Sequence, residues 1–206
     1  MRDLLPRLKL DVEALRQGRL FADARELWLE IGFGGGEHLL ARALERPDVG
    51  FIGCEPFVNG VAKLLAGVEA QGLQNIRVAM GDATALFETV PDAALSRIYL
   101  LYPDPWPKRR QHKRRFVSER SVATLARVLR TGGEVRFATD IDDYAGWTLR
   151  RFLASPGFVW TARTADDWRA PWAGWTPTRY EAKARAAGRG SAYLTFRRER
   201  SNDVDL

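Results

Sequence analysis

The chain has 206 residues, of which 46% are hydrophobic and 28% are charged, so it can bury one full-sized core and is short of two. This composition excludes intrinsic disorder, a disulfide scaffold and a fibrous repeat. The formal net charge of +6 suggests an acidic partner, but it lies in the ordinary range for a globular domain and decides little alone.

The cysteine and histidine content restricts the chemistry further. Cys54 is the one cysteine and His38 and His112 are the two histidines, so the chain can form no intramolecular disulfide, cysteine cluster or unaided zinc site. We therefore expect a reducing compartment and no metal. Charges interrupt the hydrophobic residues at the start of the chain, and no apolar run reaches membrane-spanning length. These features predict a cytoplasmic protein that does not associate with membranes.

Short apolar segments alternate with helical stretches, which is typical of an α/β sheet. The polar residues 1–25 come first, as an N-terminal arm that could be flexible, and a single domain is expected over residues 26–206. Strands buried on both faces are expected at 27–32, 50–55, 76–81, 97–102 and 134–139. A helix is expected over residues 116–130, with Thr131-Gly132-Gly133 ending it. Residues 158–161 and 192–196 are expected to pair at the end of the sheet.

A glycine-rich turn follows the first expected strand and precedes an expected helix, which is the context of a nucleotide-binding loop. Gly32 and Gly34 let the backbone turn sharply and let a ligand approach it closely. The dinucleotide fingerprint requires a glycine where this chain has Glu37, and Glu30 stands just before the loop. Two carboxylates at this place oppose a pyrophosphate and favour S-adenosylmethionine, which carries a sulfonium and an ammonium.

Two further acids stand at the ends of the next two strands. Glu55 could hold both ribose hydroxyls of the cofactor, and Asp82 could accept a hydrogen bond from its adenine amino group. The alternative is that the glycines only form a tight turn and that the acids are solvated strand ends. Three acids at three successive strand ends, Glu30, Glu55 and Asp82, favour a Rossmann-like class I S-adenosylmethionine-dependent methyltransferase. The fold class expected is α/β, with a mostly parallel seven-stranded sheet and an antiparallel C-terminal strand.

The fourth expected strand runs into the sequence YPDPWPKRRQHKRRF, at residues 102–116. With ATD at 138–140 and TRYE at 178–181, in this order, it resembles the signature of the bacterial tRNA (guanine-N7-)-methyltransferase family. The resemblance covers residues 27–196. Two departures are mild: Tyr102 replaces the commoner Phe, and Arg179-Tyr180 replaces Lys-Phe, where the arginine could alter RNA contacts.

The resemblance implies that the chain transfers a methyl group from S-adenosylmethionine to N7 of a guanine in the variable loop of tRNA, at tRNA position forty-six in the family. It implies tRNA as partner and leaves open whether the protein is a monomer or a homodimer. Asp104 would be the active-site residue and would also contact the cofactor. The substrate contacts carried over from the family motifs are Lys108, Asp140, Thr178, Arg179, Tyr180 and Glu181.

Asp104 stands in a loop that three prolines should make stiff, because each proline fixes φ and removes a backbone donor. The carboxyl end of the fourth strand borders the crevice of an open α/β sheet, so Asp104 should face both the methyl group and the base. Guanine N7 carries a lone pair and no proton, so its methylation needs neither a general base nor a Lewis acid. We expect Asp104 to orient guanine and offset its developing positive charge. The alternative is a solvated aspartate in a proline-rich loop.

Residues 108–115 contain six basic residues in eight, enough to neutralise several phosphates. A charge run is usually a solvated face, but attachment to the loop of Asp104 favours RNA docking, with Lys108 as the direct contact. Arg114 and Arg115 could simply begin the following helix.

The later motifs leave more alternatives open. Asp140 is either a substrate contact or a helix N-cap. The stretch at 178–181 is expected to be irregular, with a Thr hydroxyl and a Glu carboxylate that could read a flipped guanine. Trp168, Trp172 and Trp175 are interpreted as anchors of a small subcore, with stacking on RNA bases as the alternative. Cys54 and His38 are interpreted as core or helix-surface residues.

Three other functions compete with this interpretation. Methyltransferases acting on exocyclic amino groups place Asp/Asn-Pro-Pro-aromatic after the fourth strand, whereas this chain has Pro103-Asp104-Pro105. A noncatalytic RNA-binding module would explain the basic run but not the acids around the glycine loop. A nicotinamide-dependent oxidoreductase would explain the fold, but Glu30 and Glu37 oppose it.

Overall fold

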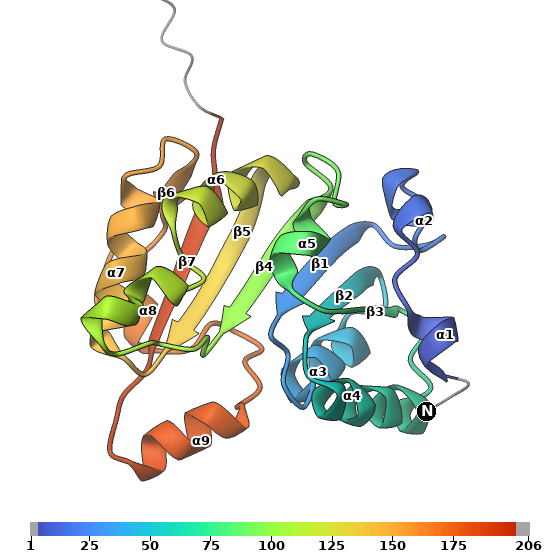
Figure 1. Ribbon diagram of the computed structural model, residues 1–206, viewed down its shortest axis with the longest axis horizontal. Helices are drawn as coiled ribbons and strands as arrows, with labels where there is room; N and C mark the ends of the chain where they lie inside the picture. The colour runs from blue at the N-terminus through green and yellow to red at the C-terminus, as the bar shows by residue number, and fades with distance from the viewer. Residues whose placement is uncertain (1–3, 201–206) are drawn as a thin grey trace, which may run out of the picture.

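One twisted sheet organises the chain in the computed structural model, which describes residues 4–200 (Figure 1). Seven strands in that range form the sheet, in the order β3-β2-β1-β4-β5-β7-β6. Their bounds are β1 Glu26–Ile31, β2 Val49–Glu55, β3 Ile76–Met80, β4 Leu95–Leu101, β5 Leu129–Thr139, β6 Phe158–Trp160 and β7 Ala192–Arg198. β1 to β5 pair in parallel, and β7 is antiparallel to both β5 and β6. The expected fold class and the pairing of the two last strands are confirmed.

Helices cover both faces of this sheet. They are α1 Leu4–Leu8, α2 Val12–Arg16, α3 Glu37–Glu45, α4 Val58–Gln71, α5 Ala83–Phe87, the 3-10 helix η1 Arg109–Arg114, α6 Glu119–Val128, α7 Asp142–Leu153, α8 Asp166–Arg169 and α9 Arg179–Ala186. The apolar sides of α3 and α4 pack on one face, and those of α5, α6 and α7 on the other. None of the helices described has the length and apolar character needed to cross a bilayer.

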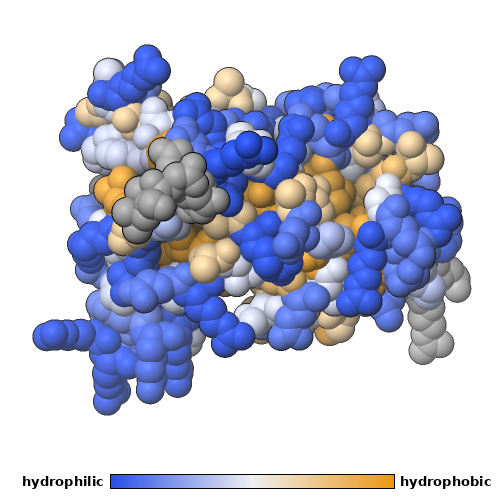
Figure 2. Space-filling view, turned by 90° about the horizontal axis from the view of Figure 1, so that it is seen from above, coloured by the Kyte–Doolittle hydropathy of each residue, from blue (hydrophilic) through white to orange (hydrophobic). Residues whose placement is uncertain are grey.

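The strand order reverses between β1 and β4, which are neighbours in the sheet although two strands lie between them in sequence. In an open α/β sheet such a switch point opens a crevice at the carboxyl ends of the strands. Figure 1 shows α9 at this end, apart from the helices that cover the faces. Figure 2 views the opposite end, where hydrophilic side chains surround smaller apolar patches.

Helix α6 begins and ends inside the expected range of 116–130. Ser118 caps it and forms a reciprocal capping box with Ser121, so the first helical residue is Glu119. The helix ends at Val128, and the next residue already pairs with Leu95 of β4. The expectation that Thr131-Gly132-Gly133 ends the helix is wrong, because these residues lie inside β5, beside an irregularity in its pairing with β4.

Residues 4–20 of the expected N-terminal arm lie against the sheet. Leu8, Leu10, Leu15 and Leu20 are buried, and the backbone N–H of Leu10 donates to the carbonyl of Val78 at 2.8 Å. The arm thereby covers the outer side of β3, an edge strand that would otherwise expose unpaired backbone groups.

Candidate functional site

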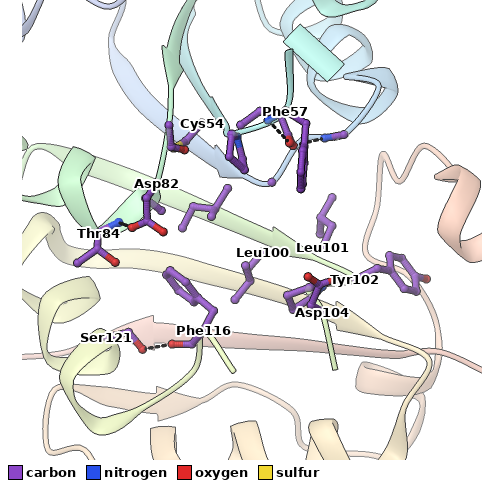
Figure 3. Close-up of a pocket in the computed structure, with 18 of the residues that line it drawn as sticks. Cys54, Phe57, Asp82, Thr84, Leu100, Leu101, Tyr102, Asp104, Phe116 and Ser121 are labelled. Atoms are coloured by element: carbon purple, nitrogen blue, oxygen red, sulfur yellow. Dashed lines mark hydrogen bonds between the residues drawn. The ribbon is translucent and has the colours of Figure 1, made fainter. Parts of the chain in front are cut away.

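A cavity of about 790 Å³ opens at the carboxyl ends of the parallel strands (Figure 3). The predicted site residues that line it are Gly32, Gly34, Glu55, Asp82, Asp104, Arg179 and Tyr180. The predicted site residues outside its lining are Glu30, Lys108, Asp140, Thr178 and Glu181. Residues from four strand ends and from α9 therefore meet in one cavity, although they span most of the sequence.

The glycine loop lies directly against the start of α4. A Cβ atom on Gly60 would lie 2.3 Å from the carbonyl oxygen of Gly34, so only glycine fits between the helix and the loop. Gly34 itself has a φ of +57°, which a side chain would strain. Its N–H donates to Glu55 at 2.9 Å, so β2 and the loop after β1 are held together at the cavity wall.

Glu55 is buried at the end of β2 and uses both carboxylate oxygens. One accepts the N–H of Gly34 and the other accepts the N–H of Phe57 at 3.0 Å. Each oxygen keeps a second lone pair, so the carboxylate can still accept hydrogen bonds from a ligand. Two backbone bonds thus fix an acceptor that faces the cavity.

Asp82 caps the N-terminus of α5 and accepts the N–H of Thr84 at 2.6 Å. The hydrogen bonds donated by Thr84 hold the pKa of Asp82 below its usual range, so it is ionised at neutral pH. Burial, together with the charges of Asp82 and Glu55, raises the pKa of the neighbouring Cys54 thiol to about 12. Cys54 is therefore a neutral thiol at neutral pH, beside the ionised Asp82.

Asp104 stands on the loop after β4, exposed and lining the cavity. Figure 3 shows Leu100 between Asp104 and Asp82. Tyr102 and Trp106 flank the loop with φ values of +49° and +44°, a region that few non-glycine residues adopt. Such backbone persists only where the surrounding structure fixes it.

Arg115, which also lines the cavity, fixes this loop. Its Nε donates to the carbonyl of Pro105 at 2.8 Å, and a terminal nitrogen pairs with Asp143 of α7. The guanidinium is buried over the rings of Tyr144 and Trp147, at 4.9 and 5.0 Å from their centroids. Sequence reasoning gave Arg115 no such role, because its partners on α7 lie about thirty residues further along the chain and no local pattern signals them.

The rest of the basic run is solvent-facing. Residues 109–114 form η1, and Lys108 stands at its N-cap. The exposed cations of this run are Lys108, Arg109, Arg110, Lys113 and Arg114. None of these five forms an ion pair within residues 4–200. Arg114 lies over the ring of Trp106, 4.9 Å from its centroid, and so connects η1 to the loop of Asp104.

Glu30 does not face the cavity. Side chains alternate along β1, so Glu30 shares the face of Trp28 and is buried beneath α3. Its carboxylate contacts Nδ1 of His38 at 2.6 Å. Because Glu30 directly precedes the glycine loop, the sequence predicts a contact with the cofactor. The alternation of side chains along β1 instead directs the Glu30 side chain to the face that α3 covers. His38 is a core residue, as interpreted.

Residues 179–181 form the first turn of α9, contrary to the irregular stretch expected at 178–181. Thr178 caps α9, and its hydroxyl accepts the N–H of Glu181 at 3.1 Å. The spacing Thr-x-x-Glu is itself a helix-start signal that stands in the sequence. Asp140 pairs with Arg189 at 2.7 Å, and Ile141 stands at the N-cap of α7.

The late tryptophans pack inside the protein, as the subcore interpretation expects. Trp172 and Trp175 lie edge-to-face with each other, at 5.3 Å between centroids, and both lie edge-to-face with Tyr193 of β7. Trp168 is half-buried and packs against the larger core cluster. These rings connect the segment before α9 to the sheet.

The sequence of this chain was compared with those of known proteins. Residues 24–194 match a family profile described as putative methyltransferase. The tRNA (guanine-N(7)-)-methyltransferase of Rhodopseudomonas palustris (strain BisB18) is 57% identical over 200 residues, which cover 95% of this chain and 80% of that protein. The enzyme of the same name from Agrobacterium fabrum is 54% identical over 198 residues, covering 94% and 85%.

Solved structures of low sequence identity share the fold. The antibiotic-resistance methyltransferase Kmr matches with a TM-score of 0.59 and 18% identity, over 92% of this chain and 94% of that one. The [4+2]-cyclase SpnF matches with the same TM-score and 16% identity, over 96% and 79%. Since a cyclase and a methyltransferase share this fold, fold alone does not give the reaction. The high identity over nearly the whole chain does give the family: this protein belongs to the tRNA (guanine-N(7)-)-methyltransferases.

Proposed function

We propose that this protein transfers a methyl group from S-adenosylmethionine to N7 of a guanine in the variable loop of tRNA, giving 7-methylguanosine. One observation carries the proposal beyond the family match. Asp104, from the family's signature loop, lines the same cavity as Glu55 and Asp82. A single cavity therefore offers acceptors for a cofactor and a carboxylate for an incoming base.

The hydrogen-bond acceptors of the cavity fit this cofactor. Glu55 offers free lone pairs to ribose hydroxyls, and ionised Asp82 offers an acceptor to the adenine amino group. Gly32 and Gly34 leave room for the methionine part, whose positive charges suit a cavity that Glu55, Asp82 and Asp104 line. Bound S-adenosylmethionine supplies an electrophilic methyl group.

Glu30 is proposed to contribute to cofactor binding from beneath the loop. Its carboxylate lies outside the cavity lining and contacts His38 of α3, so it would hold the start of α3 beneath the glycine loop without touching the ligand.

Asp104 is proposed to orient the guanine. Methylation consumes the lone pair of N7 and leaves positive charge on the ring, while no proton has to be removed at that atom. A carboxylate that accepts hydrogen bonds from guanine N–H groups stabilises this charge more in the transition state than in the ground state. The fixed loop keeps Asp104 aligned with the methyl group.

The RNA is proposed to dock on the exposed cations of η1, with Lys108 as the contact nearest the signature loop. Around the base, the proposed contacts are Asp140, Thr178, Arg179 and Tyr180, whereas Glu181, which the family motif also suggested, is completely buried. Tyr180 is the best placed of these, since it is 55% exposed and lines the cavity. An exposed ring at this place can stack on an extruded base.

The test is to incubate the purified protein with labelled S-adenosylmethionine and unmodified tRNA transcripts, digest the RNA and identify the methylated nucleoside by mass spectrometry. We expect 7-methylguanosine in the variable loop, and none with transcripts in which that guanine is replaced by adenine. Methyl transfer to another nucleoside would support S-adenosylmethionine as the cofactor and refute guanine N7 as the acceptor. Absence of transfer despite cofactor binding would refute tRNA as the acceptor.

A further inference from the structure

We propose that Glu181 is a positioning residue, which anchors the first turn of α9 over the cofactor end of the cavity, and that it does not contact the base. The inference deepens the proposed function and rests on it for the identity of the cofactor. It begins from a buried charge: Glu181 is completely buried although it belongs to a short, polar, surface helix.

Three donors occupy its carboxylate. One oxygen accepts the hydroxyl of Tyr193 at 2.8 Å and a guanidinium nitrogen of Arg185. The other accepts the indole N–H of Trp175 at 2.6 Å. Removing a buried charge from water is costly unless hydrogen bonds of this kind replace the water. Glu181 has no exposed surface and does not line the cavity.

These donors come from different parts of the fold. Tyr193 lies on β7, and Trp175 lies in the segment that precedes α9. Trp175 in turn packs on His38 of α3, at 5.4 Å between ring centroids. Glu181 therefore ties α9 to the sheet and to the helix that follows the glycine loop.

The residues just before Glu181 reach the cavity. Arg179 and Tyr180 both line it, and Nε of Arg179 lies 3.2 Å from Glu37 at the start of α3. A ring carbon of Tyr180 lies 3.8 Å from the place where a Cβ of Gly34 would be. The first turn of α9 is thus a cover over the glycine loop, and it stays there because Glu181 is held below.

The test compares Glu181→Gln with Tyr193→Phe and Trp175→Phe, which remove single donors to the carboxylate and are remote from any base. The amide of Glu181→Gln cannot accept hydrogen bonds from all three donors, and each of the other two variants removes one donor. All three variants should therefore loosen α9. We expect S-adenosylmethionine to bind about tenfold more weakly to all three variants in calorimetry, the effect of one lost buried hydrogen bond. Amide hydrogen exchange should accelerate at residues 172–186 and stay unchanged in the sheet.

Combining Glu181→Gln with Tyr193→Phe should weaken binding no more than the stronger single variant, because both remove one anchor. Glu69→Gln is the matched control: this exposed glutamate on α4 forms no side-chain hydrogen bond within residues 4–200 and should leave affinity and exchange unchanged.

Unchanged cofactor affinity and exchange in Glu181→Gln, with a raised KM for tRNA, would make Glu181 a base contact and overturn the proposal. A normal exchange pattern in Tyr193→Phe and Trp175→Phe would overturn it too, even if Glu181→Gln fails to fold. Cofactor calorimetry and hydrogen exchange need no tRNA, so a failure to form 7-methylguanosine would refute the proposed acceptor and leave these two tests standing.

Discussion

Asp104 is the residue on which the proposed reaction depends most. Asp104→Asn keeps the size of the side chain and removes its charge, so the charge on methylated guanine is no longer offset. We expect kcat to fall about 100-fold while the affinity for tRNA stays within about threefold. Single-turnover methylation and filter binding measure the two quantities. Near-normal turnover in Asp104→Asn would remove Asp104 from the active site.

Arg115 acts through the loop that carries Asp104. Arg115→Lys keeps the charge but cannot donate to Pro105 and Asp143 in the same fork, so the loop loses one attachment. We expect kcat to fall about tenfold with little change in the KM for S-adenosylmethionine, since a small displacement of a catalytic group is costly.

A double-mutant cycle separates this positioning role from a general loss of stability. Arg115→Lys should cost little further activity in the Asp104→Asn background, because the displaced group is already absent. Additive losses in kcat would show that Arg115 does not act through Asp104.

At the scale of elements, η1 concentrates cations that are free of ion pairs within the described chain. Each lysine or arginine that contacts a phosphate releases a counterion, so Lys108→Ala should raise the KM for tRNA several-fold and lower the salt dependence of binding by about one unit of slope. Cofactor affinity should not change.

Lys9→Ala removes an equally exposed lysine on the arm along β3 and should leave the salt slope intact. An unchanged slope in Lys108→Ala as well would place the RNA elsewhere on the surface.

The strands were predictable from the sequence and several site contacts were not, for one physical reason. Alternating apolar segments signal a sheet locally, and acids such as Glu55 and Asp82 at strand ends must then share one edge. The partners of Arg115 and Glu181 depend on which helices pack together, and no local pattern specifies that. Glu30 shows what a local pattern cannot predict: it precedes the glycine loop as a cofactor contact would, but its side chain lies on the other face of β1, against His38.

The whole molecule places two binding functions at one sheet edge. The switch between β1 and β4 brings the glycine loop beside the loop of Asp104, while α9 returns from the end of the chain to the same cavity. The glycine loop, Glu55 and Asp82 come from the first half of the chain and Asp104 from the second, while the first turn of α9 lies over the glycine loop.

The contacts between the N-terminal arm and β3 predict that the arm unfolds together with the sheet. Leu10 is buried in the larger core cluster and its N–H bonds to Val78, so Leu10→Ala should lower the free energy of unfolding by about 2 kcal/mol. Urea unfolding measures this loss, and Arg7→Ala, an exposed change on α1, should cost less than about 0.5 kcal/mol. A loss from Leu10→Ala as small as that from Arg7→Ala would mean that the arm is detached, as the polar sequence of residues 1–25 alone suggests. A full loss with unchanged kcat would make the arm a structural cover of the edge strand, remote from the reaction.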